Sequence, residues 1–177
     1  MLFTDRSLWT MVHGIVLGGG ALMALAAALF AMGVMRVADG SVVVRDTQSR
    51  SLAWLMVSIA VVLWLAVFVG TYIIFPAYRA TPPDGVIDLS QYPRSLLLAN
   101  PDTAWLHAFA MESKEHMPWI ASILATAVAF VSVRYRSTLL RDAQLRNMAV
   151  ILLAVCFALV SFVGLMGIFV DKGAPLQ

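Results

Sequence analysis

Four long apolar stretches constrain this chain more than any other feature of its sequence. They cover residues 8–35, 52–75, 117–133 and 148–170. A helix needs about 20 residues to cross the hydrocarbon core of a bilayer, and each stretch is close to that length or longer. Only 12% of the residues are charged, against roughly 25% in soluble domains. The sequence therefore predicts an all-α integral membrane protein, a single transmembrane domain built as an up-down four-helix bundle.

The first stretch has an alternative interpretation as a secretory signal peptide, because it follows Arg6 and ends in alanine-rich sequence. The apolar part of a signal peptide is about 7–15 residues long, and this stretch is much longer. Asp5 also offsets the charge of Arg6. We therefore expect the first stretch to be retained as a membrane span.

Arginines gather in two of the connections between the stretches. The first connection holds Arg36, Arg45 and Arg50, and the third holds Arg134, Arg136, Arg141 and Arg146. Cytoplasmic loops carry an excess of Lys and Arg, so both connections should face the cytoplasm. We expect a bacterial cytoplasmic membrane protein with both termini and the connection 76–116 on the outer side. The basic residues then report orientation and not a nucleic-acid partner, since the formal net charge is only +2.

The outer connection should contain an extra surface helix. The run Asn100-Pro101-Asp102 is typical of a helix start, with Asn100 as N-cap and a proline at the first helical position. Apolar residues among polar ones would let this helix lie on the membrane surface. Pro118 is expected to break or restart it before the third span.

Small residues recur on two of the stretches and predict close helix packing. Gly14 and Gly18 form a GxxxG pair in the first stretch, and Ala154, Ala158 and Ser161 form a small-residue stripe in the fourth. Close backbone approach of this kind supports helix association in lipid. The same residues would serve contacts within the bundle or contacts with partner subunits.

The histidines all fall in the outer half of the predicted bundle. Counting about 20 residues outward from the flanking arginines places His13, His116 and residues 70–72 at one depth, with His107 farther out. On a regular helix His13 shares its face with Gly20, Ala24 and Ala31, which would leave room below the imidazole for a flat group.

These features favour one b-type haem with His13 and His116 as axial ligands. Haem needs imidazoles at matching depth, small residues that admit the ring and cations at the propionate edge. Arg79 or Lys114 would meet the propionates, and Tyr72 lies at the same rim. His107 is a competing ligand.

This arrangement is similar to that of small four-helix membrane cytochromes b, the cytochrome b561-like kind, in which bis-histidine haem sits inside the bundle. The resemblance is architectural and rests on the four spans and on His13 and His116. The chain departs from that pattern, because no second histidine pair lies near the cytoplasmic side. The resemblance thus implies at most one haem.

Two other interpretations use the same residues. His116 would be part of an ordinary polar cap beside an aromatic belt, or it would form an outer-face metal site. Glu112 and His116 are four residues apart and suit zinc or iron, while His107 and Met111 have the same spacing and suit copper.

Several classes of function find no support in the sequence. The triplet at residues 18–20 lies inside an apolar stretch and lacks the lysine of a phosphate-binding loop. The predicted spans contain no Asp, Glu, Lys or Arg, which disfavours transport across the bilayer centre. Cys156 is the only cysteine, so this chain cannot form a disulfide framework by itself.

We therefore expect an electron-transfer subunit that links quinol, or a redox partner on the outer side, to a larger complex. It would be embedded in the bilayer among other membrane subunits. The main alternative is an accessory subunit without a cofactor that stabilises a respiratory or photosynthetic assembly. An outer-face metal-binding protein is the second alternative.

Overall fold

The part of the chain that the structure describes is mostly helical. The structure is a computed structural model, and it describes residues 4–37 and 46–175. Every regular element in those ranges is an α-helix or a π-helical segment, which confirms the all-α prediction. Arg45 belongs to the predicted first cytoplasmic loop but lies outside the described residues, as does the side chain of Arg36.

Four long helical rods account for most of the chain, and three of them combine α and π segments. The first joins α1 (Asp5–Met11), η1 (Val12–Gly19) and α2 (Gly20–Val37), and the second joins α3 (Asp46–Val69), η2 (Gly70–Ile74) and α4 (Phe75–Arg79). The third joins α6 (Pro101–Trp105), η3 (Leu106–Met111) and α7 (Glu112–Arg134), and the fourth is α9 (Ala143–Gly173). Two short helices complete the fold, α5 (Pro93–Ala99) and α8 (Arg136–Arg141). All four rods are long and apolar enough to cross a membrane, as expected of a multi-pass membrane protein.

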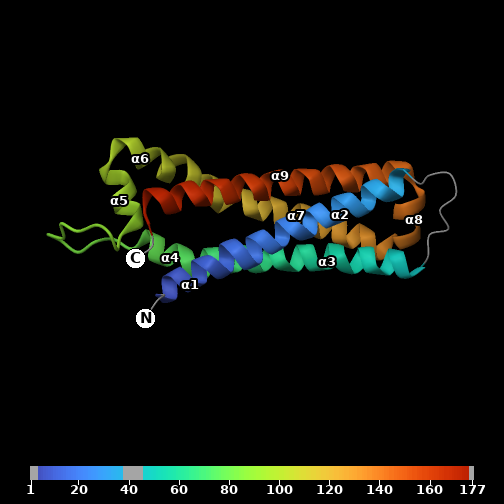
Figure 1. Ribbon diagram of the computed structural model, residues 1–177, viewed down its shortest axis with the longest axis horizontal. Helices are drawn as coiled ribbons and strands as arrows, with labels where there is room; N and C mark the ends of the chain where they lie inside the picture. Colours follow the sequence, from blue (N-terminus) through green and yellow to red (C-terminus); the bar gives the residue numbers. More distant parts are fainter. Residues whose placement is uncertain (1–3, 38–45, 176–177) are drawn as a thin grey trace.

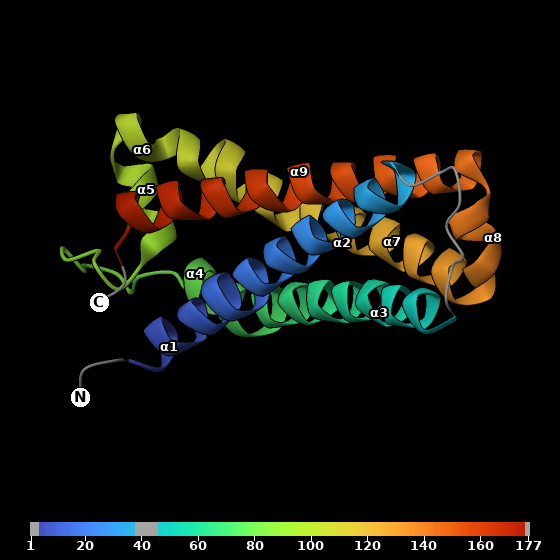
Figure 2. The ribbon, with the colours of Figure 1, turned by 45° about the vertical axis from the view of Figure 1, so that its right-hand side comes forward.

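The four rods lie side by side along the long axis of the molecule (Figures 1 and 2). α7 packs against both α3 and α9, and α2 packs against α3 and α9. Figure 1 places both chain termini at the same end as α4, α5 and α6, whereas α8 lies at the opposite end. We call the end with the termini the cap end.

Capping side chains define where two of the helices begin. Asn100 accepts a hydrogen bond from the backbone N–H of Asp102 at 2.9 Å, as predicted for this N-cap. Asp142 caps α9 in the same way and accepts from Gln144 N–H at 2.8 Å and from Leu145 N–H at 3.0 Å. These caps satisfy N–H groups that have no partner within the first helical turn.

The prediction that Pro118 breaks or restarts the surface helix before the third span is wrong. Pro118 lies inside α7, and the rod is helical from residue 101 to residue 134. A proline costs its helix one backbone hydrogen bond. α7 is held along its length by α3 and α9, so it tolerates that loss. The third rod therefore begins well before the predicted span, inside the expected outer loop.

Two apolar cores divide the bundle along its length. The larger core is made of side chains from all four rods and from α8, with Leu25, Met56, Val128 and Leu153 among its members. The smaller core lies at the cap end and joins α5 and η3 to α4 and the last turns of α9. Its members are Tyr78, Leu97, Leu106, Ala110, Met111, Met166, Val170 and Ala174.

The glycines and alanines expected at helix interfaces lie largely on the outside of this chain. A Cβ added at Gly14 would meet nothing within 4 Å, and one added at Gly18 would meet only the carbonyl of His13 in its own rod. Ala154 and Ala158 are exposed. Close packing inside the bundle uses other small residues instead, which include Ala21, Ala28, Ala121 and Ala125.

Candidate functional site

Three of the four rods contain a π segment, and all three segments lie toward the cap end. They directly follow α1, precede α4 and follow α6, which Figure 1 labels at that end. A π segment has an irregular hydrogen-bond pattern and is frequently found at functional sites. η1 contains His13, η2 begins at Gly70 and η3 contains His107. The distortions therefore coincide with two of the three histidines.

His13 points into the bundle and lies against the second rod. A Cβ added at Gly70 would lie only 3.0 Å from Cε1 of the His13 ring, so the missing side chain of Gly70 makes room for the imidazole. The ring also hydrogen-bonds to the backbone of Ala66. Its Nδ1 atom is buried and has no hydrogen-bond partner among the described residues. Buried polar atoms are rarely left in this state.

Lys114 brings a positive charge from the third rod to the same region. A Cβ added at Gly167 would lie 3.3 Å from Nζ of Lys114, so the ammonium group lies against a glycine of α9. Lys114 interacts electrostatically with His13 and with Asp171. Asp171 in turn interacts with Arg6 of α1. We call Arg6, His13, Lys114 and Asp171 the outer polar cluster.

Lys114 of the outer polar cluster lies at the level where the two apolar cores meet, and Asp171 directly follows Val170 of the smaller core. On the third rod Lys114 falls between Met111 of the smaller core and Ala125 of the larger one. On α9 the larger core ends at Cys156 and the smaller core begins at Met166, next to Gly167. Ionisable groups inside membrane helices are costly and mark functional sites by default. This cluster is therefore the leading candidate site.

His116 does not join this cluster and does not face His13. Its side chain is 72% exposed, and its Nδ1 atom lies 2.8 Å from the backbone carbonyl oxygen of Glu112 in its own helix. Lys114, two residues earlier, points inward, and side chains two apart on an α-helix diverge by about 200°. The residues at this depth therefore do not fit a haem held between His13 and His116.

The remaining residues of the predicted rim lie elsewhere. Tyr72 is 68% exposed and stacks on Phe68 with ring centroids 6.0 Å apart, a position typical of an aromatic belt. The guanidinium of Arg79 lies 4.9 Å from the ring centroid of Phe75. Neither side chain borders the outer polar cluster.

His107 and Tyr78 form a second polar pair at the cap end. The Tyr78 hydroxyl lies 2.9 Å from Nδ1 of His107. Tyr78 is buried and interacts electrostatically with Arg94 and Glu115. The Nε atom of Arg94 and the Oε1 atom of Glu115 are buried without a hydrogen-bond partner among the described residues. Sequence reasoning placed the Tyr78 phenol at the outer rim but gave no role to Arg94 or Glu115.

The two predicted metal pairs are not supported by their geometry. Glu112 Oε2 lies 4.0 Å from Nδ1 of His116, and both side chains are exposed. Met111 belongs to the smaller apolar core, while His107 turns to Tyr78. Among the described residues no group of three or more His, Cys, Asp and Glu side chains could hold a metal ion.

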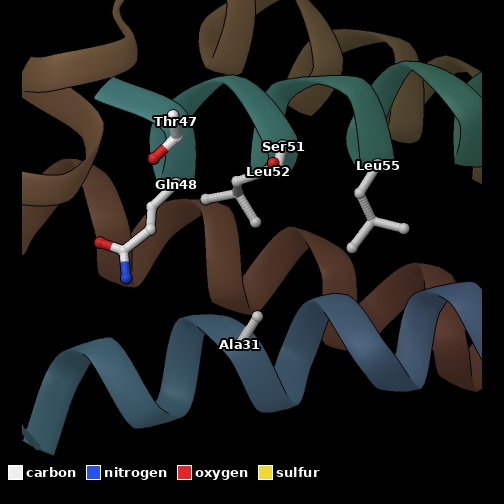
Figure 3. A pocket seen from close by; sticks show the side chains of 6 residues that line it. All are labelled: Ala31, Thr47, Gln48, Ser51, Leu52 and Leu55. Atoms are coloured by element: carbon white, nitrogen blue, oxygen red, sulfur yellow. The ribbon is translucent and has the colours of Figure 1, made fainter. Parts of the chain in front are cut away.

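A separate cavity of about 340 Å³ lies far from these residues, between α2 and α3 near the end opposite the cap. Figure 3 shows its lining, with Ala31 on α2 facing polar and apolar side chains of α3. The α3 residues are Thr47, Gln48, Ser51, Leu52 and Leu55. None of the predicted site residues reaches this cavity.

Sequence reasoning missed Arg6 and Asp171 because it placed them outside the predicted spans. Helix α1 begins at Asp5 and α9 continues to Gly173, so both residues lie inside rods. One signal was available. Arg6 precedes His13 by seven residues, and this spacing on a regular helix places two side chains on nearly the same face.

Comparisons with protein families, with curated proteins and with solved structures find no match for this chain.

Proposed function

We propose that this chain is a multi-pass subunit of an electron-transfer system in a bacterial cytoplasmic membrane, and that its outer polar cluster binds the headgroup of a quinol. The observation that carries the proposal is the electrostatic interaction of Lys114 with His13 and Asp171 on two other rods, with Lys114 between the two apolar cores. Quinols are apolar molecules with two polar oxygens, and they need such groups at membrane depth. The larger core lies on the side of the cluster that faces away from the cap end, and it excludes water there.

The proposed orientation puts the cap end outside the cytoplasm and makes the rods an up-down bundle. Both described ends of the chain lie at the cap end (Figure 1). The opposite end carries the exposed arginines Arg50, Arg134, Arg136 and Arg141, which supports a cytoplasmic position by the positive-inside rule. The outer polar cluster then exchanges protons with the outer side.

The hydrogen-bonding capacity of the cluster suits a quinol headgroup. A neutral imidazole that donates one N–H to a backbone carbonyl keeps a lone pair on its other nitrogen. With the ring bonded to Ala66, the buried Nδ1 of His13 is that acceptor and would receive the hydrogen of one quinol hydroxyl. Lys114 would donate to the second oxygen. Gly14 is exposed beside His13 with open space around it, so the lipid side is accessible.

Oxidation of the bound quinol to quinone would release two electrons and two protons. The electrons would pass to a redox centre on a partner membrane subunit. His13 would accept a proton, and Asp171, which is exposed at the edge of the cluster, would pass protons to the outer solution. This chain supplies the binding groups and the proton acceptors of that reaction.

The test is the affinity of the purified protein for a short-tailed quinone, measured by quenching of tryptophan fluorescence in detergent. Lys114→Met removes the inward-facing cation, and Lys172→Met removes an exposed cation from the neighbouring surface as the matched control. We expect Lys114→Met to weaken binding about tenfold or more, because hydrogen bonds to charged groups contribute about 1.5–3 kcal/mol. Lys172→Met should change it less than twofold. Equal quinone affinities of the wild type, Lys114→Met and Lys172→Met would refute quinol binding at this site.

An accessory role is the second candidate, and the light burial of α9 favours it. Only 17% of the most apolar window of α9 is buried inside this chain, and Ala154 and Ala158 are exposed on that helix. Exposed small residues permit close approach of another helix. Copurification of partner subunits at fixed stoichiometry, combined with no saturable quinone binding, would favour this role.

A further inference from the structure

The connection between α4 and α5 ends in an exposed apolar tip. Ile87 is 97% exposed, the highest value among the large hydrophobic residues of the described chain, and Val86 beside it is 39% exposed. In Figures 1 and 2 this connection projects from the cap end along the direction of the rods. If the rods cross a bilayer, the tip points away from it. Lipid therefore cannot cover these side chains, unlike the exposed apolar residues along the rods.

The tip is held in a defined conformation by two consecutive turns. Val86 N–H donates to the carbonyl of Pro83 at 3.3 Å, and Gly85 has a φ of +83°. A positive φ at the third position of a turn favours glycine. Past the tip, Ser90 N–H donates to Oδ1 of Asp88 at 2.9 Å. A preformed loop loses little conformational entropy when a partner binds it.

The apolar tip lies in an acidic part of the sequence. Asp84 and Asp88 flank it and are exposed. Between residues 80 and 112 there are four acids and one arginine, a net charge of −3. The four acids are all exposed: Asp84, Asp88, Asp102 and Glu112. The hydrogen bond from the backbone of Ser90 holds the pKa of Asp88 below its ordinary value, so this acid stays charged at neutral pH.

We propose that the segment 84–88 is a docking point for a soluble protein on the outer side, one whose binding face is an apolar patch ringed by lysines or arginines. An exposed aliphatic anchor in a fixed loop supplies the apolar contact. Asp84 and Asp88 beside it steer a basic partner and set its orientation. This proposal rests on residues 84–88 at the cap end and does not depend on quinol binding at the outer polar cluster.

The experiment measures binding of a basic c-type cytochrome, used as the probe, to the full chain in nanodiscs of zwitterionic phosphatidylcholine. The same cytochrome with acetylated lysines is the charge control. Ile87→Ser removes the apolar anchor, and Leu98→Ser makes a similar apolar-to-polar change at an exposed leucine of α5. Biolayer interferometry at low and high salt gives the affinities.

We expect saturable binding at low salt that weakens as salt increases, since exposed charges are screened. Ile87→Ser should weaken binding about tenfold, and Leu98→Ser less than twofold. Acetylation of the probe should abolish binding. The proposal is overturned if the probe does not bind at low salt, if acetylated and native probes bind alike, or if Ile87→Ser binds like the wild type.

Discussion

At the scale of single residues, the two histidines that are predicted to share a depth differ in direction. Counting from flanking arginines treats His13 and His116 as equivalent, because depth depends only on the number of residues. Direction depends on the face that a neighbouring helix covers. His13 lies against Gly70, while His116 points outward and lies near the backbone of Glu112. The outward direction of His116 does not fit the predicted haem pair.

The histidines form a natural pair for mutagenesis. We expect His116→Ala to change the free energy of unfolding by no more than about 0.5 kcal/mol, as for other exposed positions. His13→Ala should cost about 1–3 kcal/mol, since it removes a buried ring and leaves the Ala66 carbonyl without that partner. Thermal unfolding in detergent measures both.

Visible spectra of the same variants test the haem interpretation directly. A reduced sample with a b-type α-band that disappears in His116→Ala would contradict the outward position of His116. We expect the His116→Ala substitution to leave the visible spectrum unchanged.

At the scale of helices, the α-helical periodicity of the sequence fails across the π segments. At 100° per residue, the predicted helical face of His13 includes Gly20 and Ala31. His13 lies near the start of η1, whose remaining residues separate it from α2, and a π segment changes the number of residues per turn. Gly20 is in fact exposed, so the space below His13 is not the one expected. Period alone does not reveal where a π segment occurs.

The packing of α5 and η3 against the end of α9 leaves little room for a side chain at position 173. A Cβ added at Gly173 would lie 2.6 Å from Cδ1 of Leu106 and 2.9 Å from Cδ2 of Leu97. Gly173→Ala should therefore destabilise the cap by about 1–3 kcal/mol, the usual cost of overpacking. Faster proteolysis within residues 80–92 and a lower unfolding temperature would report the loss. Gly164→Ala is the control, because a Cβ there meets nothing within 4 Å.

At the scale of the whole molecule, the orientation can be tested by cysteine labelling. Cys156 is buried and should not react in the intact protein. Gln91→Cys places an exposed thiol in the connection before α5, and Ser137→Cys places one in α8 at the opposite end. With an impermeant maleimide, intact bacterial cells should label Gln91→Cys alone, while permeabilised cells label both. The reverse pattern would place the cap in the cytoplasm and remove the outer-side proposals.

The sequence by itself determined the helical class, the number of long apolar rods and the N-cap at Asn100, because these follow from local composition and spacing. It also placed His13 and residues 70–72 at one level. Only the tertiary structure decided which side chains meet. Lys114 interacts electrostatically with Asp171 and His13 because α7, α9 and the first rod pack together, and residues 57 positions apart in sequence carry no local signal of that interaction. The candidate site therefore comes from packing and not from a motif.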